Sequence, residues 1–192
     1  HIDEPETEKY FFGTVILVKE NTDNHIFTIV DGQQRLSTSI IFITALRDFM
    51  DEKIKKIEEK IANLDSHENK PESEKKELVH LNDQKYDYRD DLKTLEKMIW
   101  IKNRNDEKTY QNRLSLNLYN DEFFRKVILS KKTLSEKFTE LNELEKIKKK
   151  DEKIKNCYVF FYNKILEIDS SELIDPIRRI RTIWESFIDE FI

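Results

Sequence analysis

Glycine, proline and cysteine are all scarce in this chain of 192 residues, and each shortage narrows the class of protein. The chain has two glycines and three prolines. Average glycine content is about 7%, so an all-β sandwich or barrel, which needs many turn glycines, is excluded. The single cysteine, Cys157, excludes an internal disulfide framework and a metal site built from several cysteines. Apolar runs stay far below the ~18 residues of a membrane span, so we expect no membrane segment.

Charged residues are as abundant as apolar ones. Each class makes up 38% of the chain, whereas charged residues usually account for about 25%. This excess indicates long, solvated helices, and the 12 phenylalanines are enough for a core. The net charge of −5 gives no overall field that would attract nucleic acid. The chain opens at His1 without a signal peptide, so we expect a cytoplasmic protein and a piece of a longer chain.

The N-terminal part predicts a small antiparallel sheet followed by a buried helix. Residues 14–18 and 26–30 are runs of β-branched and apolar residues on either side of a polar turn at residues 21–24, the pattern of a hairpin. Both strands carry apolar residues on both faces, so we expect something to cover each side. Residues 33–50 then take up a helical period, with Leu36, Ile40, Ile43 and Met50 on one stripe.

The rest of the chain is predicted to be largely helical. Residues 54–64 carry a narrow apolar stripe, typical of a helical hairpin or a coiled-coil arm. A loop is expected at residues 65–71 with a short helix after it, a short strand near residues 114–118, and a helix from Asp121. We therefore predict an α+β fold with residues 1–50 as the sheet-containing portion and residues 51–192 as a helical extension. Two further helical stripes are Ile154, Tyr158, Phe161, Ile165 and Ile168, and Leu173, Ile177, Ile180, Trp184, Phe187 and Phe191.

The segment with the clearest chemistry is the junction between the second predicted strand and the first helix, residues 31–35 (Asp-Gly-Gln-Gln-Arg). Gly32 permits a positive φ or a close approach of a ligand to the backbone. The free N–H groups of the helix that follows favour anions, and phosphate in particular. Arg35, a cation in the first helical turn, opposes the helix dipole, which is easier to understand if an anion lies between it and the amides.

A purely structural interpretation fits the same residues. Asp31 and Gln34 have the spacing of a capping box, in which an N-cap oxygen and a glutamine three residues later satisfy each other's backbone donors. In that case Gly32 serves a tight turn and Arg35 pairs with an acidic residue elsewhere. The residues alone leave both interpretations open.

The motif resembles one bacterial family. Residues 10–13 (Tyr-Phe-Phe-Gly), the hairpin and residues 30–38 (Val-Asp-Gly-Gln-Gln-Arg-Leu-Ser-Thr) are similar to the N-terminal domain of the GmrS/GmrD modification-dependent restriction enzymes. That family has threonine where this chain has Ser37. Weaker likenesses follow at residues 113–124 and 156–161. The family's earlier Pro-x-Tyr/Phe-Gln-Arg segment and its later Asn-x-Arg-Gly segment are not present in this sequence.

The resemblance implies a fold and a function. It implies a fold similar to ParB and sulfiredoxin, a nucleoside triphosphate bound at this junction, and hydrolysis that supports DNA cleavage against phage. The implied nucleotide site consists of Gly32, Gln33, Gln34, Arg35 and Thr38. In it Asp31 holds Mg²⁺ or acts as a base, Gln33 or Gln34 orients a water, and Arg35 neutralises charge.

Other functions remain open beside it. The arginines at positions 178, 179 and 181 form the densest cationic cluster and are candidates for nucleic-acid contact, although they also suit the polar face of the last helix. The many helical stripes suit a non-catalytic module that docks a partner or self-associates. Cys157 lies within a helical stripe and is interpreted as a core residue. The four histidines are scattered and have no spacing that suits a metal site.

Overall fold

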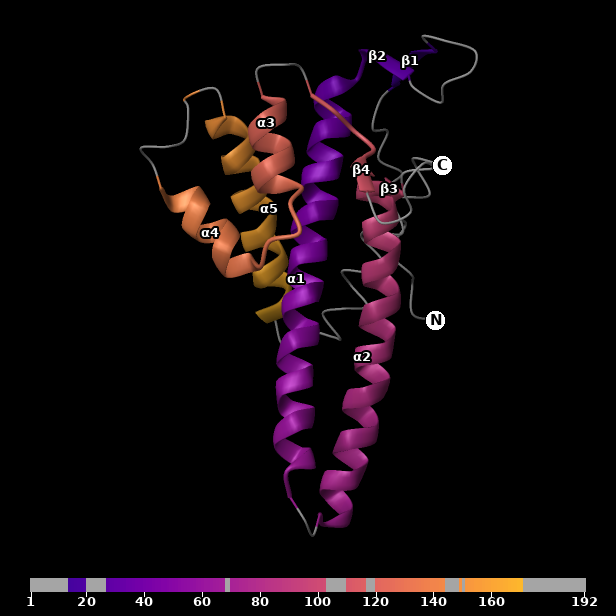
Figure 1. Ribbon diagram of the computed structural model, residues 1–192, viewed down its shortest axis with the longest axis vertical. Coiled ribbons are helices and arrows are strands. Elements are labelled where there is room, and N and C mark those ends of the chain that lie inside the picture. The colour runs from indigo at the N-terminus through magenta and orange to yellow at the C-terminus, as the bar shows by residue number, and fades with distance from the viewer. Residues whose placement is uncertain are drawn as a thin grey trace, which may run out of the picture.

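In the computed structural model, a pair of long antiparallel helices forms the axis of the molecule and shorter helices pack beside one half of it (Figure 1). The structure describes residues 14–19, 27–67, 70–102, 110–116, 120–143, 149 and 151–170. The elements are β1 (Ile16–Lys19), β2 (Phe27–Asp31), α1 (Gln33–Asp65), α2 (Glu72–Ile99), β3 (Trp100–Lys102), β4 (Tyr110–Asn112), α3 (Asp121–Phe123), the π-helix η1 (Phe124–Ile128), α4 (Leu134–Asn142) and α5 (Glu152–Ser170).

The α+β class is confirmed, with the predicted hairpin at the N-terminal end of α1. β1 and β2 pair antiparallel, with Leu17 opposite Ile29 and a register irregularity between Ile16 and Leu17. A second small hairpin, β3–β4, follows α2. The predicted strand near residues 114–118 is wrong for residues 114–116, which have no regular structure; the strands lie instead at 100–102 and 110–112, before the alternating run.

The long helical hairpin is confirmed, and it is longer than predicted. Ile54 and Ile57 are buried on α1 and meet a stripe on α2 that includes Leu81, Tyr88 and Leu95. The helix after the loop at residues 65–71 is α2, with 28 residues, so the prediction of a short helix is wrong. Its apolar positions are diluted by many Lys and Asp residues, which hides the period. α1 itself runs unbroken through residues 50 and 51, where the two predicted portions meet.

The centre of α1 is buried on every side. Eight consecutive residues, 43–50, are buried, because α2 packs on one flank of α1 and α4 and α5 pack on the other (Figure 1). The predicted stripe of α5 is confirmed, with Ile154, Tyr158 and Ile165 buried. A helix buried all round is normally apolar all round, yet residues 47 and 48 of α1 are Arg and Asp. Those two charges need partners inside the core.

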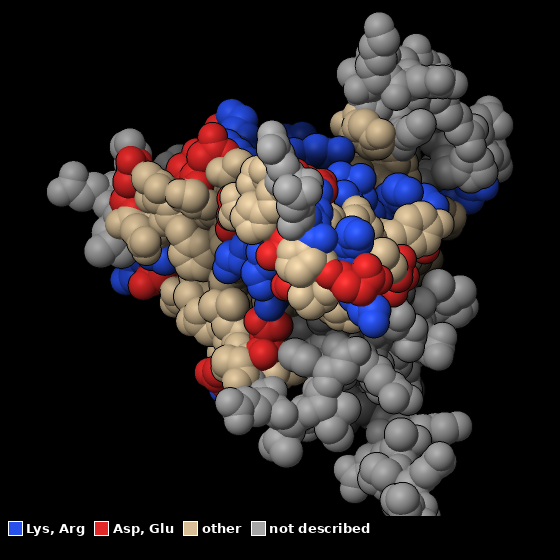
Figure 2. Space-filling model, turned by 90° about the horizontal axis from the view of Figure 1, so that it is seen from below, with Lys and Arg blue, Asp and Glu red and all other residues tan. Residues whose placement is uncertain are grey.

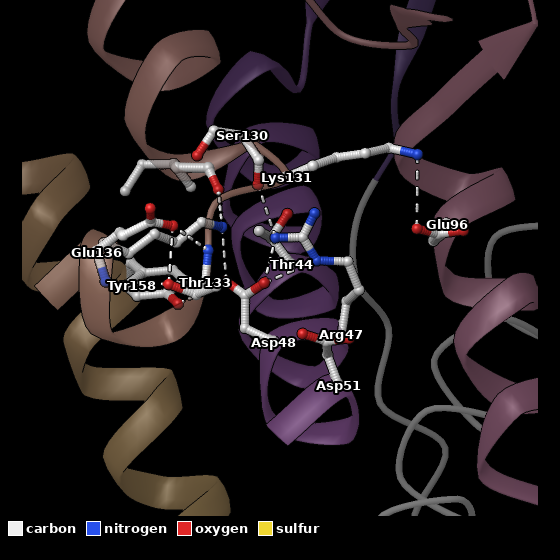
Figure 3. Close-up of polar contacts among 12 residues, drawn as sticks. Thr44, Arg47, Asp48, Asp51, Glu96, Ser130, Lys131, Thr133, Glu136 and Tyr158 are labelled. Atoms are coloured by element: carbon white, nitrogen blue, oxygen red, sulfur yellow. Dashed lines mark hydrogen bonds and ion pairs between the residues drawn. The ribbon is translucent and has the colours of Figure 1, made fainter. Parts of the chain in front are cut away.

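The Asp48 carboxylate is the centre of a buried polar network, defined here as Arg47, Asp48, Lys137 and Tyr158 (Figure 3). One carboxylate oxygen accepts from the Arg47 Nε at 2.7 Å. The other accepts from the Lys137 Nζ at 2.7 Å and the Tyr158 hydroxyl at 2.6 Å. Lys137 also donates to the Ile128 carbonyl at 2.6 Å. A single carboxylate thus joins α1 to α4, η1 and α5.

The network extends to the end of α2 through aromatic contacts. The Arg47 guanidinium lies 4.8 Å from the centre of the Trp100 ring and donates to the Ser130 carbonyl at 2.9 Å. The Lys131 ammonium lies 4.8 Å from the same ring and 3.7 Å from the Glu96 carboxylate. Cation–π contacts gain strength where the cation has lost water, so the buried Arg47 contact helps to hold β3 against α1.

The charged form of Lys137 is disfavoured in the folded protein, because the side chain is buried and a second cation, Arg47, lies at the same carboxylate. Burial lowers the pKa of Lys137 from 10.5 to about 8, although the Asp48 charge acts in the opposite direction. Burial also raises the pKa of the Tyr158 hydroxyl, with the Asp48 charge in support, and raises that of Tyr162 to about 12.

The first prediction concerns the pH dependence of stability. Between pH 8 and 10.5 the unfolded chain keeps the Lys137 proton that the folded chain has released. The free energy of unfolding therefore rises with pH in this window. Above about pH 10 these tyrosines ionise in the unfolded chain, while burial keeps Tyr158 and Tyr162 protonated in the folded chain. This lowers the free energy of unfolding, so the useful range is pH 8 to 10. Across it we expect the native chain to gain stability relative to Lys137→Met, on the order of 1–3 kcal/mol, in urea unfolding. Lys132→Met, at a partly exposed lysine, serves as the control and should parallel the native profile; parallel behaviour of Lys137→Met would contradict the prediction.

Candidate functional site

The turn between β2 and α1 is built around Gly32. Its backbone has φ 88° and ψ 10°, the left-handed conformation, which residues other than glycine rarely adopt. A Cβ at this position would lie 3.0 Å from the Val15 Cγ2 atom and 3.3 Å from the Val15 Cα atom. Both the conformation and the close approach of the segment before β1 therefore require glycine here.

No side chain that the structure describes caps the first turn of α1. Gly32 is the N-cap residue, so the capping-box interpretation of Asp31 and Gln34 is wrong. The physical reason is that a glycine in the left-handed conformation, not Asp31, occupies the cap position. The first intrahelical bond runs from the Leu36 N–H to the Gly32 carbonyl at 3.0 Å. The N–H groups of residues 33–35 precede it and have no intrahelical acceptor.

Arg35 lies at the surface of this turn and contacts Thr14, just before β1, and Asp31, at the end of β2. Its guanidinium donates to the Thr14 carbonyl and lies 3.5 Å from the Asp31 carboxylate. The arginine side chain is 36% exposed and the aspartate side chain 57%. An ion pair this exposed contributes at most about 1 kcal/mol, so both groups keep most of their capacity to bind other charged groups.

The side chains of Gln33 and Gln34 differ in whether the protein holds them in place. The Gln33 side-chain amide donates to the Ile29 carbonyl at 2.9 Å, which folds it back onto β2. Gln34 is exposed, and its backbone carbonyl accepts from the Ser37 hydroxyl at 3.0 Å. Of the two, Gln34 is therefore the side chain at the turn that is better placed to meet a ligand or a water.

Thr38 faces the helical part of the molecule. Its side chain hydrogen-bonds with Cys157 of α5, and burial raises the pKa of that thiol despite this bond. Cys157 is half-buried and packs against the core cluster, as its interpretation as a core residue requires. The structure therefore groups residues 31–35 at the turn and directs Thr38 toward α5.

Several predicted features lie elsewhere. Arg178, Arg179 and Arg181, and the helical stripe of residues 173–191, lie outside the described residues. Within the described ranges, no group of three or more His, Cys, Asp and Glu side chains is arranged to hold a metal ion. In the same part of the chain, no helix combines the length and the apolar composition that crossing a bilayer requires.

The sequence analysis missed two sets of contacts, one at the β2–α1 turn and one in the core. The contacts of Val15 with Gly32 and of Arg35 with the Thr14 carbonyl join residues far apart in the chain, and no local pattern marks them. The buried network was also missed. A signal for it existed, because an Arg-Asp pair at residues 47 and 48 interrupts an otherwise apolar helical stretch.

The fold and the turn together define a mainly helical α+β domain with an uncapped, arginine-bearing helix start. The comparison with protein families gives the class of protein to which this domain belongs. The chain matches the model of the GmrSD restriction endonuclease N-terminal domain over residues 2–189. It therefore belongs to that family, and the resemblance inferred from residues 31–35 is confirmed. Neither the curated proteins nor the solved structures include a match to the chain, so the likeness to ParB and sulfiredoxin stays a prediction.

The second prediction tests the turn itself. Gly32→Ala introduces a Cβ against Val15 and a strained φ, so we expect a loss of roughly 1–3 kcal/mol in the free energy of unfolding, measured by urea or thermal unfolding. Gly32→Asn keeps the close contact but tolerates the left-handed conformation better, and should lose less. Equal stability of Gly32→Ala and the native chain would show that the turn does not require glycine.

Proposed function

We propose that this domain is the nucleotide-binding, NTP-hydrolysing module of a bacterial restriction and phage-defence protein, with the triphosphate bound at the β2–α1 turn. Membership of the restriction endonuclease family supplies the setting. The observation that carries the nucleotide proposal is the start of α1, where uncapped amides and the Arg35 guanidinium lie together. Free helix amides and a neighbouring cation are the two components of a phosphate site.

In this proposal the phosphates lie beyond Gly32. The N–H groups of residues 33–35 donate to phosphate oxygens, and the left-handed conformation of Gly32 forms the corner from which these amides follow. Arg35 keeps its bond to the Thr14 carbonyl and turns a second nitrogen from Asp31 to phosphate. Giving up the exposed pair with Asp31 costs little, and a charge-assisted bond to phosphate replaces it.

Asp31 and Gln34 take the remaining roles. Mg²⁺ is held in many phosphate sites by one or two carboxylates together with phosphate oxygens and waters. The exposed Asp31 carboxylate fits this role once Arg35 moves to phosphate. When bound, the ion would neutralise phosphate charge. Gln34, exposed at the same turn, orients the attacking water, and Gln33 fixes the turn through its bond to the Ile29 carbonyl.

DNA would be reached through other parts of the full-length protein or a partner nuclease domain. Seen along the long helices, positive and negative side chains are interspersed over the described surface (Figure 2). Near the tip of the α1–α2 hairpin, cations pair with acids, as in the Lys70–Asp65 and Lys75–Glu72 ion pairs. Among the residues of this face that the structure describes, both signs of charge occur side by side, without the single-sign patch that binds nucleic acid (Figure 2). It suits a docking role instead, the alternative function of a helical interaction module.

The third prediction tests the proposed phosphate site by calorimetric titration of Mg–nucleoside triphosphate. Arg35→Ala should weaken binding by about 10- to 100-fold, because a charge-assisted hydrogen bond contributes about 1.5–3 kcal/mol. Arg125→Ala is a matched control, since Arg125 pairs with Asp121 at the same i, i+4 spacing on another helix start. It should leave the affinity unchanged.

Two results would count against the proposal. An Arg35→Ala affinity equal to that of the native chain would remove Arg35 from the site. No heat of binding from the native chain at millimolar triphosphate would remove the site altogether and favour the docking role. Phosphate release by the native chain, reduced in Gln34→Ala with binding retained, would support the role given to Gln34.

A further inference from the structure

The solvent side of α2 carries two large apolar residues that lie outside the core. Val79 is 63% exposed and Tyr86 is 73% exposed. They are seven residues apart in the sequence, which is close to two helical turns, so they lie on one face of the helix. The buried stripe of α2, which includes Leu81, Tyr88 and Leu95, lies on the opposite face. A second apolar seam on the outer side of a long helix is typical of a helix that pairs with another helix.

An open hollow lies beside Val79 on this face. It is lined by Glu72, Lys75, Lys76 and Val79 and has a volume of about 240 Å³. An apolar side chain surrounded by charged ones suits an aromatic ring with a polar tip. Tyr86 exposes such a ring on the same face. The face therefore carries both a ring and a place for one, which is what a self-complementary contact between two copies of one chain requires.

The charges on this face favour an antiparallel contact. In an antiparallel pair centred between residues 82 and 83, residue 79 of one chain lies opposite residue 86 of the other. In the same register Glu72 lies opposite Lys93, and Lys75 lies opposite Asp90. All four side chains are exposed and fall on the same side of α2 as the apolar seam. In a parallel pair each of these residues would instead meet its own copy, so every contact would join like charges.

These four charges are available for a partner. The Lys75 ammonium lies 3.8 Å from the Glu72 carboxylate, and the two side chains are 62% and 75% exposed, so this pair contributes little to the single chain. Among the described residues, no ion pair involves Asp90 or Lys93. In the antiparallel register the four side chains form a cluster of alternating sign at each end of the contact.

We propose that the outer face of α2 is an interface for a second copy of this chain, with the two α2 helices antiparallel about a two-fold axis between residues 82 and 83. Tyr86 of each chain occupies the hollow beside Val79 of the other. A single helix face of this length buries far less than the roughly 2,000 Å² typical of an obligate dimer, so the dimer is reversible. The interface contains none of the residues of the β2–α1 turn, so the inference does not rest on the proposed function.

The register also creates one unfavourable contact. Asp83 is exposed and lies next to the two-fold axis, on the same side of α2 as Val79. The Asp83 carboxylates of the two chains therefore approach each other at the centre of the interface, where like charges oppose association. A neutral side chain at this position should strengthen the dimer.

The fourth prediction concerns the association of the full chain, measured by sedimentation velocity over a range of concentrations. The native chain should show an equilibrium between monomer and dimer. Tyr86→Ser should weaken the dimer by about 100-fold, because both copies lose the central ring. Phe160→Ser, at an apolar residue of α5 that is 56% exposed, is the matched control and should leave the affinity unchanged. Asp83→Asn should strengthen the dimer by about 3- to 10-fold.

Two charge reversals test the register. Lys75→Glu and Asp90→Lys should each weaken the dimer by about 10-fold, because each variant places like charges opposite each other at two positions. The double variant Lys75→Glu with Asp90→Lys exchanges the two signs and should restore the native affinity. A parallel pair would show no such restoration. Circular dichroism and the unfolding midpoint check that each variant keeps the native fold, which substitutions at exposed positions should preserve.

Four results would overturn the proposal. The first is a native chain that remains monomeric at about 1 mM. The second is a dimer that is as stable in Tyr86→Ser as in the native chain, as expected if the chains associate through the apolar residues of the β1–β2 hairpin, which are 48–59% exposed. The third is a double charge variant that dimerises no better than its two single variants. The fourth is an Asp83→Asn dimer no stronger than the native one.

Discussion

The carboxylate of Asp48 is the interaction on which the arrangement of this domain depends. It accepts from Arg47, Lys137 and Tyr158, which come from three different helices, at a place where α1 is buried on every side. Removing one member of a buried charged network leaves its partners uncompensated and costs several kcal/mol. The network therefore fixes the position of α1 along its own axis relative to α4 and α5. The β2–α1 turn, whose Gly32 precedes Asp48 by 16 residues, takes its position from that contact.

Much of the architecture follows from the sequence, because helical stripes and β-branched runs are local patterns. Spacing predicts the hairpin with strands at residues 14–18 and 26–30, the stripe from Ile54 to Leu64 and the stripe of α5. It does not predict the length of α2, since the apolar positions of this helix are separated by charged residues that solvate its outer face. The β3–β4 hairpin was missed because its strands have three residues each, too few to show a period. The network of Asp48 joins residues up to 110 positions apart, and a single sequence contains no signal for which charges meet.

At the candidate site, too, local patterns predict some features and long-range contacts decide the others. The identity of residues 31–35 was enough to place the chain in its family, and the left-handed Gly32 is what a glycine between a strand and a helix suggests. The choice between a capped and an uncapped helix start required coordinates, because it depends on which residue occupies the N-cap position. The partners of Arg35 also required them, since the Thr14 carbonyl lies 21 residues earlier in the chain. Thr38 resembles its neighbours in the motif, but its side chain hydrogen-bonds with Cys157 of α5, and no local pattern marks a contact between residues so far apart in the chain.

The continuity of α1 has a mechanical consequence. This one helix of 33 residues, about 50 Å long, begins at the turn, passes through the buried centre and ends at the tip of the projecting pair. Sharp bends in helices arise at prolines, inserted waters or π-bulges, and α1 contains no proline. The helix is therefore one continuous element that is clamped over residues 43–50, where every residue is buried. A displacement of its first turn is opposed by this clamp, so the β2–α1 turn and the far tip are joined by a single stiff connection that runs through the core.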